Sequence, residues 1–360
     1  MGETDDHNAT PPAAEATEAA VKVSVCDADP PWSEYLGRHP QATLFHNPRW
    51  GVVMERAYGN RPYYLTARRG DAVVGVLPLV LQRSVLFGTH LCSIPYFDAA
   101  GILADDAEAA RALTEEAGGL MEQTRAGWVE LRYADPVADS LPSRTDKVTL
   151  RLRLPRDPDE LWKGFDAKVR NQIRKGEREG ITVDQGEAEL ADAFCRVYVR
   201  TMRDLGSPPH SLRFFRLVVE HFAAASRLFV ARLGQEIVAA SFTLTDAVAT
   251  RVPWAASDWR FRSSNANMLI YWHMLKSACE RGSNCFDFGR STRDSGTYRF
   301  KRQWGAEEVP LHWHYVLPPG AAVPDVRPDS PKYRLAVAVW RRLPLGVVRA
   351  LGPRLIAKLS

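Results

Sequence analysis

The spacing of apolar residues predicts a mixed α/β protein, because stretches with strand periodicity alternate with stretches of helical periodicity. A helix is predicted from Asn47, with Pro48 at its first position, to about Gly59. Residues 63–68 and 72–81 are predicted to form a β-hairpin, since a turn-forming Arg-Gly-Asp separates two apolar runs. After this hairpin, the pattern predicts a helix over about 105–125 and a strand over 128–133.

The second half of the chain repeats this order of elements. Residues 229–240 align with residues 64–75 once one residue of slip is allowed, and the shared Ala-Arg pairs lie 231 − 67 = 164 residues apart. In both halves a helix and then a strand carrying an acid follow, with Glu130 in one strand and Asp287 in the other. Such self-similarity predicts two tandem copies of one mixed α/β unit.

The repeat suggests a division of the chain into four parts. Residues 1–20 contain no Lys or Arg and few large apolar residues, which predicts a disordered tail. The first domain is predicted over residues 21–145, and the second over residues 146–318, which include the basic loop 287–306. Residues 319–360 form a basic, amphipathic C-terminal segment.

A strongly marked helix is predicted between the two copies, over residues 157–180. Asp157 caps it, Glu160 completes a capping box, and Gly180 ends it. Its cations fall on two flanks by helical spacing. One flank holds Lys163, Arg170 and Arg174, and the other holds Lys168, Lys175 and Arg178. Two interpretations stay open, a solvated basic face and a face that contacts a polyanion.

The segment 287–306, DFGRSTRDSGTYRFKRQWGA, concentrates cations in a Gly- and Ser-rich loop. These are Arg290, Arg293, Arg299, Lys301 and Arg302. If residues 298–304 are extended, Tyr298, Phe300 and Trp304 anchor one face, while Arg299, Lys301 and Gln303 project from the other. The loop is either a solvated basic turn packed by its aromatic residues or the cationic rim of a cleft that stabilises negative charge.

The start of the helix that follows the strand 249–257 is a candidate for a further anion site. Ser264 or Asn265 is a natural N-cap, and the free backbone N–H groups there would lie beside Arg260 and Arg262, with Asn267 in the first turn. A well-capped helix without a ligand explains the same pattern.

The C-terminal residues 332–360 hold seven cations and no acid, interleaved with Trp340, Leu343, Val347, Leu351, Leu355 and Ile356. Such a segment is typical of a helix that lies on an anionic membrane leaflet. It would equally serve as a cap on the domain core.

Composition excludes several classes of protein. The 360 residues carry a net charge of +4, which is too small to identify a nucleic-acid binder. The five cysteines show no Cys-x-x-Cys pair, and the stretch His312-Trp-His314 has no third ligand at metal-site spacing, so no metal is expected. There is no nucleophile elbow, Walker loop or dinucleotide fingerprint, and Asp287-Phe-Gly289 lacks the other kinase motifs. With an acidic amino terminus and no apolar stretch of membrane-spanning length, the expected location is the cytoplasm.

With these elements placed, residues 21–360 resemble the Fem-type family, the FemAB and FemX peptidyltransferases that share the acetyltransferase (GNAT) fold. The resemblance lies in LWKGFDAKVRNQIRKGEREG at 161–180, in PYFDAAGILAD at 95–105, and in DFGRST followed by GTYRFKRQWGA. In particular, the chain resembles the FemAB-like proteins associated with PEP-CTERM and exopolysaccharide systems of Gram-negative bacteria. The resemblance implies two tandem GNAT-like domains, each with a mixed, mostly antiparallel sheet flanked by helices.

The resemblance also implies roles for individual residues. Fem-type enzymes move an aminoacyl group from aminoacyl-tRNA to an amino group of a peptidoglycan precursor. Phe300 and Lys301 match the family's Phe-Lys pair, whose lysine serves the reacting end of the donor. Arg170 matches the arginine that holds the precursor's phosphates, and Asp105 falls where the family has a Gly-Pro-x-x-Asp acid.

We therefore expect an acyl or aminoacyl transferase with no permanently bound cofactor. Its donor would be aminoacyl-tRNA or acyl-CoA, and its acceptor an amino or hydroxyl group of an anionic nucleotide- or lipid-linked envelope glycan. Lys301 would stabilise the developing negative charge, and Asp105 or Asp98 would accept the acceptor's proton. The residues expected to bind substrate are Arg170, Arg174, Lys168, Arg290, Arg299, Phe300, Tyr298, Trp304 and Asn267.

Two alternatives stay open. One is a CoA-dependent N- or O-acetyltransferase of exopolysaccharide biosynthesis. The other is a non-catalytic module that binds anionic glycan or membrane, the membrane through residues 332–360.

Overall fold

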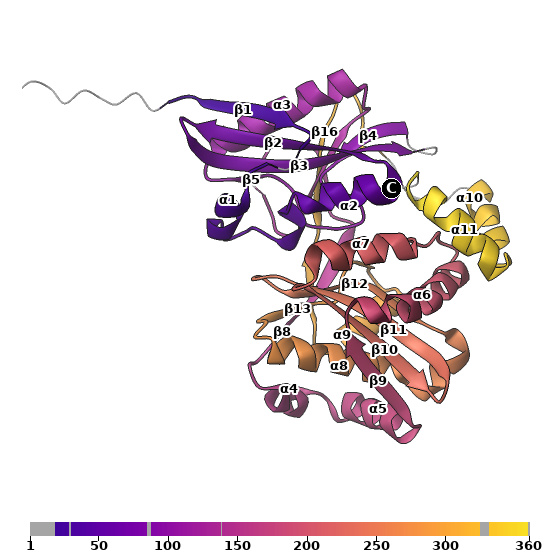
Figure 1. Ribbon diagram of the computed structural model, residues 1–360. Helices are drawn as coiled ribbons and strands as arrows, with labels where there is room; N and C mark the ends of the chain where they lie inside the picture. The colour runs from indigo at the N-terminus through magenta and orange to yellow at the C-terminus, as the bar shows by residue number, and fades with distance from the viewer. Residues whose placement is uncertain (1–18, 29, 85–87, 138, 325–330, 359–360) are drawn as a thin grey trace, which may run out of the picture.

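The computed structural model describes residues 19–28, 30–84, 88–137, 139–324 and 331–358, and its two lobes are each built on one mixed sheet (Figure 1). The first sheet has eight strands in the order β1-β2-β3-β4-β6-β16-β7, with β5 paired to β3. These strands are β1 Val21–Cys26, β2 Arg61–Arg69, β3 Ala72–Ser84, β4 Gly88–Cys92, β5 Leu103–Ala104, β6 Val129–Tyr133, β7 Ser143–Arg144 and β16 His312–Val316. Helices α1 Ser33–Arg38, α2 Arg49–Tyr58 and α3 Ala107–Thr124 pack around it.

The second sheet also has eight strands, in the order β14-β8-β13-β12-β11-β10-β9, with β15 paired to β8. They are β8 Lys147–Arg153, β9 Ile181–Gly186, β10 Ser226–Leu233, β11 Glu236–Thr245, β12 Thr250–Ser257, β13 Cys285–Asp287, β14 Ser291–Thr292 and β15 Glu307–Pro310. Its helices are α4 Pro158–Gly164, α5 Ala167–Arg178, α6 Ala191–Leu205, α7 Leu212–Phe222, α8 Ala266–Glu280 and α9 Gly296–Arg302, and the chain ends in α10 Pro331–Trp340 and α11 Leu345–Ile356. Short 3-10 helices lie at Leu44–His46, Ala188–Leu190 and Trp259–Ser264.

The predicted duplication is confirmed by the strand pairing. The hairpin β2–β3 shifts register between Ala67 and Arg68, and the hairpin β10–β11 shifts register between Ala231 and Arg232. These are the two Ala-Arg pairs that the sequence aligns. Because a bulge adds one residue to one strand only, its recurrence at matching positions marks the two hairpins as copies of one unit.

In each lobe a parallel pair of strands follows the hairpin. Strands β4 and β6 pair only at Leu91 with Val129 and Cys92 with Glu130. Strands β12 and β13 pair only at Thr250 with Phe286 and Arg251 with Asp287. In both lobes a helix between the two strands, α3 or α8, provides the crossover that parallel neighbours require. Beyond Arg251 and Asp287, β12 and β13 no longer pair, and residues on both sides of this opening line a cavity.

The predicted boundary between the domains needs a correction. Residues 146–318 were assigned to the second domain, but β16 pairs along its whole length with β6 of the first sheet, and β7 pairs with β16. Strand β15, by contrast, stays in the second sheet on β8. The chain therefore returns to the first lobe after completing the second, because the edge beside β6 would otherwise expose unpaired backbone groups.

Two helical segments also differ from prediction. The helix expected over 157–180 is broken at Phe165 and Asp166, whose extended backbone separates α4 from α5. The segment 298–304, considered as a strand, instead lies in the helix α9 up to Arg302 and in the turn that follows it. The Ser295 hydroxyl caps this helix by accepting a hydrogen bond from the Tyr298 N–H at 3.1 Å. Residue 301 therefore takes its orientation from a helix, and the alternation of faces expected for a strand does not apply.

One apolar core joins the two lobes. Helix α2 of the first lobe packs on α7 of the second, and the rings of Trp50 and Phe222 stack at 4.4 Å. Phe97 meets Trp254 edge to face at 5.7 Å. All four side chains belong to a single buried cluster. This shared core fixes the position of one lobe against the other, and hence the shape of the cavity between them.

Helices α10 and α11 pack beside α6 and α7 (yellow in Figure 1). In the described part of the chain, no helix has the length and apolar character that crossing a membrane requires. The tail predicted over residues 1–20 lies outside the described residues except for its last two.

Candidate functional site

A cavity of about 300 Å³ lies between the lobes, next to the opening between β12 and β13. The first lobe contributes Phe45 and the loop 96–99. The second lobe contributes residues from β8, β12, α8, the turn after β13 and α9. These are Thr149, Arg251, Val252, Pro253, Ala255, Tyr271, Asp287, Phe288, Gly289, Arg290, Thr297 and Lys301. Ala134 and Leu311 complete the wall.

The backbone of β12 is irregular where it borders this cavity. Phe242 pairs with Trp254 and Leu244 with Arg251, so two residues of β12, Val252 and Pro253, face one residue of β11. This is a β-bulge, and Pro253 has no N–H to donate to a neighbouring strand. Across the opening, Gly289 has a φ of +75°, and a Cβ there would lie 3.0 Å from the Val252 carbonyl oxygen. The opening therefore depends on two features. Val252 and Pro253 bulge out of the regular pairing of β12, and Gly289 has no side chain that would fill the gap.

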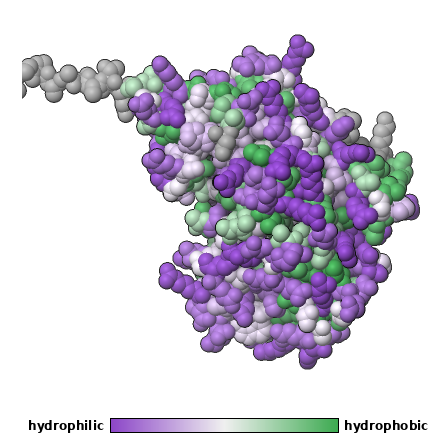
Figure 2. Space-filling view, in the orientation of Figure 1, coloured by the Kyte–Doolittle hydropathy of each residue, from purple (hydrophilic) through white to green (hydrophobic). Residues whose placement is uncertain are grey.

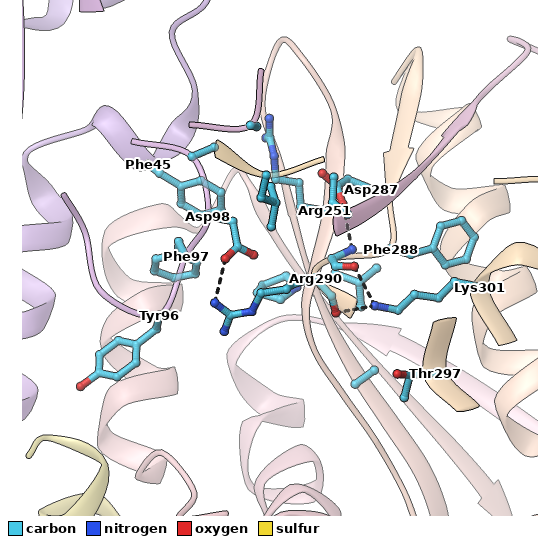
Figure 3. A pocket seen from close by; sticks show the side chains of 18 of the residues that line it. Phe45, Tyr96, Phe97, Asp98, Arg251, Asp287, Phe288, Arg290, Thr297 and Lys301 are labelled. Carbon is cyan, nitrogen blue, oxygen red and sulfur yellow. Dashed lines mark hydrogen bonds and ion pairs between the residues drawn. The ribbon is translucent and has the colours of Figure 1, made fainter. Parts of the chain in front are cut away.

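Lys301 extends from α9 to the turn after β13 (Figure 3). Its ammonium donates hydrogen bonds to the carbonyl oxygens of Gly289 at 2.7 Å and Arg290 at 3.0 Å. The side chain is 8% exposed, and this burial lowers its pKa to about 8, although the charges of Asp287 and Asp98 oppose the shift. An ammonium has three N–H donors, so one remains for a ligand in the cavity.

A cross-lobe ion pair lies opposite Lys301. Arg290 Nη1 is 3.1 Å from Asp98 Oδ1, and the guanidinium also lies over the ring of Trp313 at 5.2 Å. Arg132 lies 4.6 Å from the centroid of the same ring. Asp98 and the Trp313 indole thus fix the orientation of Arg290. Its side chain is directed to Asp98 and its carbonyl to Lys301 (Figure 3).

The other two charged groups of the cavity are fully engaged. Asp287 accepts hydrogen bonds from the Thr149 hydroxyl and from the Gly289 N–H, the latter at 2.8 Å. Arg251 forms an ion pair with Asp246, and its guanidinium lies over the Phe45 ring at 5.5 Å. The side chains of Asp287 and Arg251 therefore hold the cavity walls in place. Lys301 and Asp98 remain as the groups best placed to act on a substrate.

A second hollow of about 210 Å³ lies on the other side of α9. It is lined by Gln172, Val238, Ser257, Asp258, Phe261, Arg262, Asn265, Ala266, Asn267, Met268, Phe300 and Gln303. Asn265 has a φ of +59° and provides no side-chain cap to α8. Its carbonyl accepts the Met268 N–H at 2.9 Å, so the uncapped N–H groups at the start of this helix are those of Ala266 and Asn267. Short helix α9 therefore contributes Thr297 and Lys301 to one cavity and Phe300 and Gln303 to the other.

Some of the sequence-predicted residues meet at the first cavity. Lys301, Asp98 and Arg290 line it together. Asn267 and Phe300 line the second hollow, where Asn267 donates a hydrogen bond to the Ser257 hydroxyl at 3.1 Å. Trp304 is 1% exposed and packs against Phe165, with ring centroids 5.4 Å apart, so it supports α9 from beneath.

Other predicted residues lie outside both cavities. Asp105 forms an ion pair with Arg38 at 3.0 Å next to β5, on a part of the first lobe that does not reach the cavity. Arg299 donates a hydrogen bond to the Asp294 carbonyl at 2.7 Å, and the Tyr298 hydroxyl donates one to Glu308 at 2.8 Å. Because α9 is a helix, successive residues point in different directions and these two face away from Lys301.

The basic helix α5 lies at the end of the second lobe remote from the first (Figure 1). Arg170 donates hydrogen bonds to the carbonyl oxygens of Lys163 and Phe165, so it caps the end of α4. Arg174 lies over the Trp162 ring at 5.4 Å. Lys168 is exposed. None of the three lines the cavity that holds Lys301, whereas Gln172 of the same helix lines the second hollow.

Sequence reasoning missed Arg251, Thr149 and Tyr271. Arg251 carried a usable signal, since it is the one charged residue within the strand predicted over 249–257. Thr149 and Tyr271 carried none, because a hydroxyl in an amphipathic strand or helix looks like any other core residue.

The described residues contain no group of three or more His, Cys, Asp or Glu side chains that could hold a metal ion. His314 forms a contact of 2.7 Å between its Nδ1 atom and Asp139 Oδ1.

Comparison with known families finds a match in the second lobe. Residues 163–302 match the acetyltransferase (GNAT) domain family. This stretch includes the bulge of β12, α8 and Lys301 on α9. The search of curated proteins found no match.

Solved structures show the same fold over most of the chain. FemX matches with a TM-score of 0.60 and 16% identity, covering 79% of this chain and 94% of that chain. L-PGS from Bacillus licheniformis matches with a TM-score of 0.54 and 12% identity, covering 92% and 98%. A tandem GNAT protein from the clavulanic acid biosynthesis pathway matches with a TM-score of 0.51 and 13% identity, covering 82% and 99%. The chain therefore has a tandem GNAT fold, as the sequence predicted.

Proposed function

We propose that this protein is an acyl or aminoacyl transferase and that its reaction takes place in the cavity between the lobes. The observation that carries the proposal is the buried ammonium of Lys301 in that cavity, with Asp98 and Arg290 on the facing wall. A buried cation with a spare donor can stabilise an anion that forms beside it, and the match of residues 163–302 to the GNAT domain family supports acyl transfer.

The proposed step is the attack of an amino or hydroxyl group on the carbonyl of an ester or thioester. As the new C–N or C–O bond forms, the carbonyl oxygen gains negative charge, which the third N–H of Lys301 would stabilise. The carbonyl then reforms as the bond to the leaving alcohol or thiol breaks. Asp98 would take the proton of the attacking group, and the departing oxygen or sulfur takes up a proton in turn.

The donor would enter from the side of the second hollow. The uncapped N–H groups at the start of α8 and the Arg262 guanidinium favour a phosphate there. Lys168 lies four residues before Gln172, and Lys175 lies three residues after it. By helical spacing, both lysines share the face of α5 on which Gln172 borders this hollow. We therefore assign these two lysines of α5 to the donor's phosphates, whereas the Fem-type resemblance implied that Arg170 of the same helix holds the phosphates of the acceptor.

The acceptor would enter through the first lobe, past the loop 96–99. We propose an amino or hydroxyl group of a nucleotide- or lipid-linked envelope glycan, in keeping with the resemblance to Fem-type proteins and to the FemAB-like proteins of exopolysaccharide systems. Arg290 lines the cavity and forms an ion pair with Asp98 at 3.1 Å. An anionic acceptor would therefore meet a cation already held in position.

The test is a donor screen followed by one substitution. Purified protein is incubated with acetyl-CoA or with charged tRNA in the presence of cell-envelope precursors, and mass spectrometry detects the product. Lys301→Ala should reduce turnover by about a hundredfold or more. The matched control is Arg299→Ala on the same helix, which removes an exposed cation bonded to Asp294. Equal turnover by Lys301→Ala and the native protein would refute the role of Lys301.

A CoA-dependent acetyltransferase is the second candidate, and the second hollow favours it. A pyrophosphate is the ligand that uncapped N–H groups beside an arginine bind well. If this candidate holds, acetyl-CoA should raise the melting temperature, since a ligand that binds only the folded protein stabilises it. A rise with charged tRNA and none with acetyl-CoA would favour the aminoacyl reaction.

A further inference from the structure

Helices α10 and α11 are amphipathic in the folded protein, with one face buried and the other exposed. Trp340 is 9% exposed and donates a hydrogen bond to the Ser207 carbonyl at 3.0 Å. Val348 is fully buried, and a Cβ at Gly352 would lie 2.4 Å from Pro209. This face caps the core at the loop between α6 and α7. The helical pair is thus firmly attached to the second lobe, and its outer face is free of the core.

The outer face carries an apolar stripe. Val347, Leu351 and Leu355 follow one another at four-residue spacing on α11, and Leu335 and Val339 do the same on α10. Their exposed fractions are 38%, 42% and 39% on α11 and 67% and 52% on α10. Figure 2 shows apolar surface at the right, where Figure 1 places these two helices. Five of the ten exposed large apolar residues in the described chain lie here, and such clustering marks an interaction surface.

The charge around this stripe has one sign. From residue 331 to 358 the sequence contains cations and no acid. Arg334, Arg341, Arg342, Arg349, Arg354 and Lys358 are all exposed. An apolar stripe bordered by cations fits the surface of an anionic lipid bilayer, where the apolar side chains enter the acyl region and the cations meet the phosphates.

A cavity of about 620 Å³ lies where α11 meets α6 and α7. Its apolar floor includes Val199, Leu212 and Leu345, and its arginines are Arg196, Arg200, Arg213 and Arg349. Its acid, Asp192, is held by Arg216 at 2.7 Å, and Arg200 is held by Asp258 at 2.6 Å.

Three of these arginines, Arg196, Arg213 and Arg349, form no hydrogen bond or ion pair with the residues that the structure describes. Arginines gathered around an apolar floor without partners suit the phosphate of an amphiphile, since the guanidinium forks bind the phosphate oxygens.

We infer that the stripe on α10–α11 and this arginine-lined cavity form one docking site for an anionic phospholipid bilayer, in which the cavity holds a lipid phosphate. The inference goes beyond the proposed function, because none of these residues lines either cavity assigned to transfer. It also explains why the helices present cations and apolar groups on their outer face after their inner face has already capped the core.

A second copy of this chain is the less suitable occupant. A symmetric dimer through this face would bring the same cations together from both copies, and no acid between residues 331 and 358 would offset them. A bilayer with anionic headgroups offsets them directly.

The experiment measures co-sedimentation of the full chain with vesicles of phosphatidylcholine alone and of phosphatidylcholine mixed with phosphatidylglycerol. We expect binding to the mixed vesicles that weakens as salt increases. The triple variant Arg196→Gln/Arg213→Gln/Arg349→Gln should bind on the order of a hundredfold more weakly, since each cation near such a surface contributes. Leu351→Gln/Leu355→Gln should lose binding by about tenfold or more.

Matched controls separate a located site from general attraction. Arg83→Gln/Arg111→Gln/Arg153→Gln removes three exposed arginines elsewhere, so the net charge changes equally. Val25→Gln/Val248→Gln removes two apolar residues that are 37% and 41% exposed. We expect both controls to bind vesicles like the native protein. Circular dichroism confirms that each variant is folded, and turnover with soluble substrates is expected to be unchanged.

Three outcomes would overturn the inference. The first is equal loss of binding in the triple variant and its arginine control, which would reflect net charge alone. The second is a phosphate-induced rise in melting temperature that the triple variant loses while vesicle binding persists, which would assign the cavity to a soluble phosphate. The third is a dimer in the absence of vesicles that Leu351→Gln/Leu355→Gln dissociates, since the stripe would then be covered by a second copy.

Discussion

Arg290 connects the two candidate catalytic groups, because its guanidinium lies 3.1 Å from Asp98 while its carbonyl accepts a hydrogen bond from Lys301 at 3.0 Å. Asp98 belongs to the first lobe and Lys301 to the second. One residue therefore sets the position of an acid and a cation that come from different halves of the chain. The cavity between them is fixed by the shared core, in which Trp50 of α2 stacks on Phe222 of α7.

The first prediction concerns the proton acceptor. Asp98→Asn should lower kcat by about a hundredfold or more, because an amide cannot take the proton of the attacking group. Steady-state kinetics with the donor found in the screen provide the measurement. The control is Asp105→Asn, which removes the other predicted acid from its ion pair with Arg38. A larger loss of kcat in Asp105→Asn than in Asp98→Asn would reverse the assignment made from the structure.

The second prediction concerns the pH dependence of catalysis. Burial lowers the pKa of Lys301 from 10.5 to about 8, so the cationic form declines as pH rises through that value. The ratio of native turnover to that of Lys301→Ala should therefore fall above about pH 8. The ratio isolates Lys301, because the ionisation of the attacking amine affects both proteins. A ratio that stays constant from pH 7 to pH 10 would contradict a role for the charged ammonium.

The third prediction concerns stability and follows from the same pKa. Between about pH 8 and pH 10.5 the unfolded chain binds a proton at residue 301 that the folded protein does not, so the free energy of unfolding rises with pH. Relative to Lys301→Met, the native protein should gain on the order of 3 kcal/mol across this window. Chemical denaturation at several pH values measures the difference. Lys168→Met, which removes an exposed lysine, serves as the control for the loss of a lysine side chain.

The fourth prediction concerns the opening between β12 and β13. Gly289→Ala should destabilise the protein by about 1–3 kcal/mol, because alanine disfavours a positive φ. The added Cβ would also lie 3.0 Å from the Val252 carbonyl oxygen. Gly296→Ala is the control, since its Cβ would meet no atom within 4 Å. Equal stability of the two variants in urea would indicate that the turn relaxes without cost.

The sequence predicted the duplication because each copy keeps its local hairpin signal, down to the Ala-Arg pair at which the bulge occurs. It also placed Lys301, Asp98 and Arg290 among its candidates. It did not predict that β16 returns to the first sheet, since pairing between residues 129–133 and 312–316 depends on contacts far apart in the chain. The alternating pattern of residues 298–304 also led to a wrong expectation of a strand. Ser295 caps a helix there, and the aromatic residues pack around that helix.

Basic residues were the least predictable part of the site. Arg170 and Lys301 both lie in cation-rich segments, yet one caps the end of α4 and the other lines the cavity. Sequence spacing gives the face of a helix on which a cation lies, but the partner that it finds depends on packing between elements. Arg251 was missed for a related reason, since its role depends on Asp246 and on Phe45 in the other lobe.

The last prediction tests whether the contact between Arg251 and Asp246 couples the two lobes. The Asp246 carboxylate binds Arg251 and accepts a hydrogen bond from the Leu44 N–H of the first lobe at 2.8 Å. Asp246→Ala should cost about 3 kcal/mol or more, because it leaves a buried guanidinium without its partner. Adding Arg251→Met should restore part of this loss, since no unpaired charge then remains. Chemical denaturation of the two variants gives both values.

The comparison for this prediction is an exposed pair of similar geometry. Arg232 lies 2.7 Å from Asp184, with side chains 34% and 48% exposed. Asp184→Ala should cost under about 1 kcal/mol, because water screens the charges and replaces the lost partner. If Asp246→Ala cost no more than Asp184→Ala, the Arg251 side chain would have to reach solvent in solution, and the wall that it forms beside the cavity could not be rigid.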